Sequence, residues 1–239
     1  MVDLTNKTCI ILAHGSSLSE LENRIEEFRN KDVVWCGMNY FNPSEDILKK
    51  IDKSFSIVFD CSTVKNNKSY EMYYRLPRLK EFLNRNNTTY ITLKSGRDNL
   101  YDLRNRLGDD FNEKYKEKII YGENLDFNCD QFCVSLHLYI ACLLKLQAKR
   151  IILFGADGGG IYGNSVSSYY KENLILEDKK HADNVSYNMV GDTNNVNCSF
   201  GPIMQSIFGY IPEIINCSEV STYNVFKKVT YDQLLKEVI

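Results

Sequence analysis

A short turn near the amino terminus carries residue types that bind phosphate. An apolar run, Cys9 to Ala13, leads into His14-Gly15-Ser16-Ser17 and then into an amphipathic segment. The backbone N–H groups of such a turn and its two serine hydroxyls can surround a phosphate, and the dipole of a following helix would add to the attraction. The segment is neither a P-loop nor the dinucleotide-binding glycine pattern. A tight turn in which Ser17 caps the helix explains it equally well.

A second glycine-containing stretch, Asp157-Gly158-Gly159-Gly160, follows the most hydrophobic predicted strand. The glycines would let the backbone approach a ligand closely, and Asp157 can hold a ribose or sugar hydroxyl or bind a metal. Asp60 ends another apolar strand, so Asp60 and Asp157 together could bind Mg²⁺ for phosphoryl chemistry. The competing interpretation is the start of a flexible loop and two carboxylates that never meet.

A histidine and several tyrosines lie in a polar stretch in the second half of the chain. His181 stands in "EDKKHADNVSYN", close in sequence to Tyr169 and Tyr170. Such a histidine can act as general base or acid, and tyrosines can hold a phosphate or carboxylate; a solvated loop histidine is the alternative. In the apolar helix predicted over 133–148, Ser135 can point toward a site or bond to its own helix, whereas His137 is more typical of a satisfied core histidine.

Short apolar strands alternate with helical patterns along the chain. The predicted strands are 8–13, 33–38, 56–60, 89–94, 150–157 and 211–218, and the predicted helices are 18–30, 44–52, 70–86, 133–148, 202–209 and 230–238. This alternation predicts a single α/β domain over residues 1–239, Rossmann-like and doubly wound, with a mostly parallel sheet. The polar residues 158–200 are expected to form a lid or loop insertion.

In a doubly wound sheet, ligands lie beyond the carboxyl ends of the strands. That rule selects the small and polar residues that follow the predicted strands, among them His14, Gly15, Ser16, Ser17, Asn39, Asp60, Ser62, Asp157, Gly158, Asn216 and Ser218. Because turns are polar in any protein, the rule predicts where a site lies without naming its ligand.

The composition of the chain excludes several classes of function. A chain of 239 residues with a formal net charge of −2 gives no case for binding nucleic acid or an acidic membrane. No apolar run reaches the ~18 residues of a membrane span, and we find no signal-peptide core. The eight cysteines include no CxxC pair and lie as often in apolar segments as in turns, which favours reduced, mostly buried thiols in a cytoplasmic protein over a zinc site or a disulfide framework.

An ordered set of segments resembles the family-42 bacterial sialyltransferases. The resemblance extends to the wider group that includes the motility-associated-factor glycosyltransferases and the archaeal MptE-like hydroxymethylpterin pyrophosphokinases. The segments that carry it are "IILAHGSSLSEL", "VVWCGMNYF", "SIVFDCSTV", "SLHLYIACLLKLQAKRIILFGAD" and "IINCSEVSTYNVFKKVTYDQLL". It spans most of the chain and implies a GT-A-variant nucleotide-binding fold.

The resemblance also implies roles for individual residues. The positions that match the family's nucleotide-donor site are Ser16, Asn39, Ser135, Asp157 and Ser218. His181 matches the histidine that deprotonates the acceptor hydroxyl, and the tyrosines that would hold the departing phosphate are Tyr162, Tyr169 and Tyr170.

The function implied is glycosyl transfer from a nucleotide-sugar donor, such as a CMP-activated acidic sugar, onto a glycan or other hydroxyl acceptor, with no metal required. One alternative is Mg²⁺-dependent diphosphate transfer from ATP to 6-hydroxymethyl-dihydropterin, with Asp60 and Asp157 as metal ligands. Another is a non-catalytic module that binds a nucleotide or glycan. The sugar, nucleobase, acceptor and oligomeric state stay open.

Overall fold

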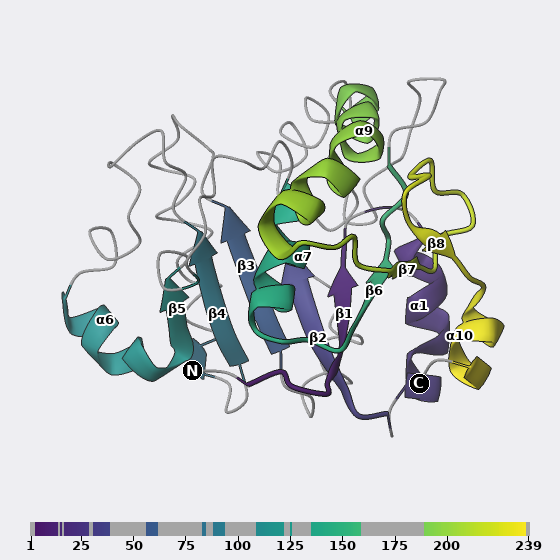
Figure 1. Ribbon diagram of the computed structural model, residues 1–239. Coiled ribbons are helices and arrows are strands. Elements are labelled where there is room, and N and C mark those ends of the chain that lie inside the picture. Colours follow the sequence, from purple (N-terminus) through teal and green to yellow (C-terminus); the bar gives the residue numbers. More distant parts are fainter. Residues whose placement is uncertain are drawn as a thin grey trace.

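An eight-stranded sheet organises the computed structural model of this protein (Figure 1). The structure describes residues 3–13, 15, 17–28, 31–38, 56–61, 83–84, 88–93, 109–121, 125, 135–158 and 189–237. The strands are β1 (Thr8–Leu12), β2 (Val33–Met38), β3 (Ser56–Cys61), β4 (Thr88–Leu93), β5 (Ile119–Tyr121), β6 (Arg150–Phe154), β7 (Ile214–Asn216) and β8 (Lys227–Lys228). Every pairing between these strands is parallel, as the sequence predicted.

Between β1 and β6 the chain changes the direction in which it adds strands to the sheet. Across the sheet the order is β5-β4-β3-β2-β1-β6-β7-β8, so the chain moves outward from β1 to one edge and then returns to build the other half. Leu12 of β1 pairs with Phe154 of β6, so these two strands end side by side. Such a reversal is the topological switch point of a doubly wound sheet, where ligands of this fold class bind.

Helices cover both faces of the sheet, as Figure 1 shows. On one face lie α1 (Leu18–Arg24), the 3₁₀ turn η1 (Ile25–Phe28) and α10 (Tyr231–Glu237), and on the other lie α7 (Ser135–Lys145) and α9 (Met189–Phe208). Near the β5 edge lie α6 (Asp109–Tyr115) and the 3₁₀ turn η4 (Lys116–Lys118). None of the described helices combines the length and the apolar character needed to cross a membrane.

Strands β1 and β6 are apolar over their last four residues, because both faces of the sheet are buried there. In β1, Cys9 and Ile11 belong to the core cluster under α7 and α9, whereas Ile10 and Leu12 belong to the cluster under α1 and α10. In β6, Phe154 belongs to the second cluster, where its ring lies 5.0 Å from that of Tyr231 between centroids. Two cores thus share one sheet.

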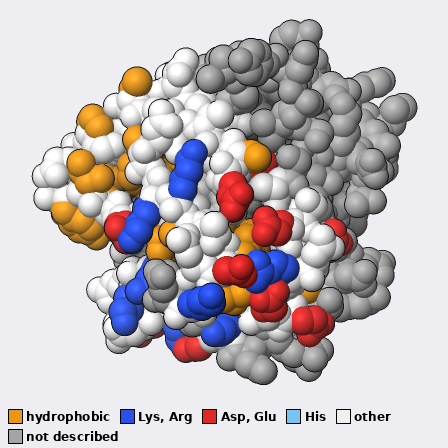
Figure 2. All heavy atoms as spheres, turned by 90° about the vertical axis from the view of Figure 1, so that its right-hand side faces the viewer, with side chains coloured by type: hydrophobic (Ala, Val, Ile, Leu, Met, Phe, Trp, Pro, Cys, Tyr) orange, Lys and Arg blue, Asp and Glu red, His pale blue; other side chains and the backbone are white. Residues whose placement is uncertain are grey.

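The surface of α1 and α10 is polar. Figure 2 shows acidic and basic side chains interspersed on this side of the molecule. Arg24 of α1 bonds to Glu27 at 2.7 Å and to Asp232 of α10 at 2.6 Å, and its guanidinium also lies over the ring of Tyr231. The ion pair between Arg24 and Asp232 joins the two helices at their exposed faces.

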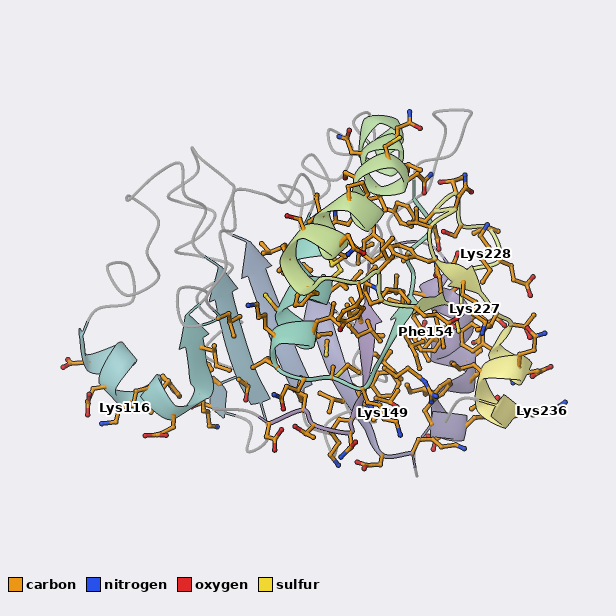
Figure 3. The ribbon with its side chains drawn as sticks, viewed as in Figure 1. Lys116, Lys149, Phe154, Lys227, Lys228 and Lys236 are labelled. Atoms are coloured by element: carbon orange, nitrogen blue, oxygen red, sulfur yellow. The ribbon has the colours of Figure 1, made fainter. Side chains whose placement is uncertain are left out.

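Two short edge strands escaped the sequence analysis. β5 spans three residues, and β8 consists of Lys227 and Lys228, which Figure 3 places at the opposite side of the sheet from Lys116. Exposed lysines at a sheet edge discourage pairing with another chain, and two charged residues carry no apolar pattern that would predict a strand.

The interpretation of residues 189–200 as loop is wrong, because α9 begins at Met189 rather than at 202. Val196, Phe200 and Met204 recur every four residues and are buried, but asparagines and a glycine hide this stripe. Pro202 lies inside the helix, and the helix is visibly bent in Figure 1, as a proline usually causes. The helix predicted over 44–52 lies outside the described residues, and of 70–86 only 83–84 are described.

Candidate functional site

Three segments meet beyond the carboxyl ends of β1, β6 and β7, at the switch point. The N–H of Gly15, in the β1–α1 turn, donates to the carbonyl oxygen of Gly155 at 2.7 Å. The N–H of Thr222, in the β7–β8 loop, donates to the carbonyl oxygen of Asp157 at 2.9 Å. We call the residues that join these segments the switch-point cluster: Gly15, Ser17, Asp157, Asn216, Ser218, Ser221 and Thr222.

The carboxylate of Asp157 is the centre of the cluster. Its side chain is buried, with 2% of the residue exposed. Oδ2 accepts a hydrogen bond from the Ser17 N–H at 2.9 Å, and Oδ1 accepts from the Ser218 hydroxyl at 2.6 Å and from the Ser17 hydroxyl. A buried charge is tolerated when it is hydrogen-bonded in this way, so Asp157 links β6 to both neighbouring segments.

Asn216 and Ser221 hold the other side of the cluster. The fully buried Asn216 amide donates to the carbonyl oxygen of Ala156 at 3.0 Å and to Ser221 Oγ at 2.9 Å, while its oxygen accepts the Ser218 N–H at 3.2 Å. The Ser221 hydroxyl donates to the same Ala156 oxygen at 2.8 Å. These bonds fix the backbone on both sides of Ser218.

Two glycines make this close packing sterically feasible. A Cβ on Gly15 would lie 2.4 Å from both Cγ and Oδ2 of Asp157, a distance that real Cβ atoms do not show. Gly158 has a φ of +72°, and a Cβ there would lie 2.5 Å from Thr222 Oγ1. The two glycines therefore allow close contacts within the protein.

The β1–α1 turn uses its described N–H groups within the protein. Besides Gly15 and Ser17, the N–H of Leu18 donates to the Gly15 carbonyl at 3.1 Å, and that of Glu20 to the Ser17 carbonyl at 3.2 Å. Ser17 occupies the N-cap position of α1, but its side chain makes no capping bond. The predicted N-cap position of Ser17 is confirmed, and its hydroxyl donates to Asp157 rather than making a capping bond.

The structure brings together five of the predicted residues, Gly15, Ser17, Asp157, Asn216 and Ser218, with Gly158 beside them. It missed Ser221 and Thr222, although the hydroxyl-rich stretch "NCSEVST" after the last predicted strand offered a signal. The other predicted residues His14, Ser16, Asn39, Ser62, Tyr162, Tyr169, Tyr170 and His181 lie outside the described residues, and for Asp60 and Ser135 only the backbone is described.

The sheet order bears on the proposed pair of carboxylates. Asp60 lies on β3, and β2 and β1 separate that strand from β6, which leads to Asp157. Three inter-strand steps amount to roughly 14 Å, which argues against a single Mg²⁺ bound directly by both side chains. Within the described ranges, no group of three or more His, Cys, Asp or Glu side chains is arranged to hold a metal ion.

His137 lies in the core between α7 and α9. It is fully buried, and its ring centroid is 5.3 Å from that of Phe200. In the described part of the chain neither ring nitrogen has a hydrogen-bond partner, and burial lowers the pKa of His137 to about 4. The predicted core location is confirmed, but the prediction of a satisfied histidine is wrong.

Comparison with solved structures supports this fold. No family model matches the sequence, and no curated protein matches it. A solved structure does: the sialyltransferase CstII from Campylobacter jejuni, in complex with the substrate analogue cytidine-5′-monophosphate. The TM-score is 0.53 at 18% identity, over 95% of this chain and 86% of that chain.

The two proteins share a fold. At 18% identity the likeness shows the fold alone, and it confirms the Rossmann-like, sialyltransferase-type architecture that the sequence motifs predicted.

Proposed function

We propose that this chain transfers a sugar from a nucleotide-sugar donor to a hydroxyl acceptor. The observation that carries the proposal is the fold, which a sialyltransferase solved with a cytidine nucleotide shares over almost the entire chain. A polar, ordered cluster at the switch point of this fold supports it, because that is where ligands of doubly wound sheets bind. A CMP-activated acidic sugar is the first donor to test.

The proposed chemistry is a substitution at the anomeric carbon. His181 takes the proton of the acceptor hydroxyl, the acceptor oxygen bonds to the anomeric carbon, and the bond from that carbon to the phosphate oxygen breaks. Tyr162, Tyr169 and Tyr170 donate hydrogen bonds to the departing phosphate, where negative charge develops. Ser16, Asn39 and Ser135 are the proposed donor contacts. This scheme needs no metal ion.

A thermal-shift panel tests the nucleotide. CMP, CDP, UDP, GDP and ATP are each measured with and without Mg²⁺. A ligand at about 100 times its Kd adds about 2.7 kcal/mol to the free energy of unfolding, which raises the Tm of a chain of this size by about 5–10 °C. We expect that rise with CMP or CDP in the absence of metal. A rise with ATP alone, and only with Mg²⁺, would support diphosphate transfer instead.

The His181→Ala variant tests the proposed base. Without its base the variant should lose transfer about 100-fold or more, while CMP still raises its Tm as in the wild type. Lys116→Ala is the matched surface control, since Lys116 is exposed and lies far from β6 and β7 in Figure 3. Full transfer activity in His181→Ala would refute the assignment, and loss of CMP binding as well would move His181 from catalysis to binding.

A further inference from the structure

We propose that Asp157 is a positioning residue: its buried carboxylate locks the β1–α1 turn to the β7–β8 loop, and it contacts neither the donor nor a metal ion. This differs from the role that the sequence motifs imply for Asp157, which is a direct donor contact. The lock itself follows from the described geometry, whereas its effect on donor binding rests on the proposed function.

The first step of the argument is the occupancy of the carboxylate. A carboxylate offers about four acceptor positions, and Asp157 uses at least three of them for the Ser17 N–H, the Ser17 hydroxyl and the Ser218 hydroxyl. A Mg²⁺ ion or a ribose hydroxyl would have to replace one of these bonds inside a buried site. The β1–α1 turn is suited to bind an anion such as phosphate, but here its bonds go to the carboxylate of Asp157.

The second step is that the backbone of Asp157 is fixed as well. Its carbonyl oxygen accepts the Thr222 N–H at 2.9 Å, and the preceding carbonyl, of Ala156, accepts from Asn216 and Ser221. Lys228 of β8 donates to the carbonyl of Ser221 and so ties the far end of the loop to the same cluster. Asp157 cannot turn toward a ligand without breaking several of these bonds.

The third step connects the lock to the donor. Ser16 is a proposed donor contact, and the chain is held on both sides of it: Gly15 by the Gly155 carbonyl and Ser17 by Asp157. Without the Asp157 carboxylate, the Ser17 side of the turn loses its hydrogen bond, and of these two bonds only the one from Gly15 to Gly155 is left. Asp157 thus acts on the donor through the backbone of the β1–α1 turn rather than by touching it.

A double-mutant cycle on Tm tests the lock without any ligand. Ser17→Ala, Ser218→Ala and Asp157→Asn should each lower the Tm by about 3 °C or more. In the Asp157→Asn background, Ser17→Ala and Ser218→Ala should each lose at least half of their effect, because their acceptor is already impaired. Ser199→Ala, which removes a hydroxyl bonded within α9, is the matched control and should be additive. Full additivity of Ser17 and Ser218 with Asp157 would refute the lock.

Nucleotide affinity separates positioning from contact. Kd is measured at low temperature, where all variants are folded, for CMP and for 2′,3′-dideoxy-CMP. A positioning role predicts that Asp157→Asn weakens both ligands by the same factor, about tenfold, and that Ser17→Thr, which keeps the hydroxyl, binds better than Ser17→Ala. If Asp157 held the ribose, its substitution would abolish the preference for CMP over the dideoxy compound. Unchanged affinities despite a lower Tm would show a merely structural residue.

The two proposals can fail separately. If the wild type binds none of the nucleotides in the panel, the proposed function falls, and the Tm cycle still decides whether Asp157 locks the two segments. If Asp157→Asn does not fold, Ser17→Ala and Ser218→Ala each remove one donor and keep the carboxylate. Equal weakening of CMP and dideoxy-CMP in both serine variants then supports positioning, and unchanged affinity for both overturns it.

Discussion

At the scale of single residues, the switch-point cluster combines a buried charge with backbone that approaches it closely. Asp157 is tolerated because hydroxyl and amide donors surround it, and those donors reach it because Gly15 has no side chain. The glycine and the aspartate therefore depend on one another. A substitution at Gly15 acts on Asp157 through space, although the two residues lie far apart in the sequence.

Gly15→Ala should lower the free energy of unfolding by about 2 kcal/mol or more, because the new Cβ overlaps the Asp157 carboxylate and the Gly155 carbonyl. Chemical denaturation measures the change. Gly201→Ala is the matched control: its Cβ would lie 3.3 Å from the end of the Ile211 side chain, and alanine favours the interior of α9. The control should be neutral or stabilising. A Gly15→Ala protein as stable as the control would contradict the contact with Asp157.

The residue scale also shows how far sequence alone can predict a site. The rule of strand ends selected Gly15, Ser17 and Asp157, which the structure places together, because strand ends are recognisable from apolar runs. It could not predict that Ser17 donates to Asp157, since that bond depends on β1 and β6 being neighbours. The sequence therefore predicted that these residues lie near one another, but not which of them bond to each other.

At the scale of elements, α9 shows why polarity alone is a poor guide to loops. Its buried stripe is only one residue wide per turn, and the asparagines in its first half are weak helix formers. The side chain of Asn197 bonds to the β7–β8 loop. Its amide nitrogen donates to the Thr222 carbonyl at 3.1 Å, and its amide oxygen accepts from the Asn224 N–H at 2.7 Å. Tertiary contacts, which a sequence window does not contain, hold this helix in place.

The α7–α9 contact should be sensitive to acid because of His137. Its pKa falls from 6.5 in the unfolded chain to about 4 in the folded protein, since burial disfavours the charged ring. The unfolded chain therefore binds a proton first, and the free energy of unfolding falls as the pH drops from 6.5 toward 4, by up to about 3 kcal/mol. Urea denaturation at a series of pH values measures this loss.

His137→Leu should remove this part of the pH dependence and leave the rest. The comparison is most informative between pH 6.5 and 5, above the range in which most carboxylates titrate. The remaining slope in the variant belongs to other titratable groups. Parallel pH profiles of the wild type and the variant would show that His137 does not titrate on unfolding.

At the scale of the whole molecule, one sheet joins two cores. Alternate residues of β1 and β6 belong to the two core clusters on opposite faces of the sheet. Unfolding of either layer of helices would therefore expose one face of the same central strands. The alternation of strands and helices in the sequence predicted this architecture, because each apolar strand needs cover on both sides. The strand order, which creates the switch point, is set by long-range pairing and became visible only in the structure.

The cysteines provide a test of whether the two cores unfold together. Cys142 of α7 lies in one core and Cys217, after β7, lies in the other, and both are buried. Burial raises the pKa of the Cys217 thiol to about 12, so its reaction with a thiol reagent near pH 8 requires opening of the structure. Cys198, which is exposed on α9, should react in the native state and serves as the internal reference.

Because both cores share β1 and β6, we expect Cys142 and Cys217 to become reactive at the same urea concentration. Pulse labelling in increasing urea, with each cysteine identified by peptide mass, measures the two midpoints; Cys198→Ser confirms the native-state signal by removing it. Coincident midpoints mean that α1 and α10 on one face and α7 and α9 on the other form one cooperative unit. If Cys217 reacts at a clearly lower concentration, the layer of α1 and α10 opens on its own, and the Asp157 lock to the β1–α1 turn is too weak to couple it to the rest of the molecule.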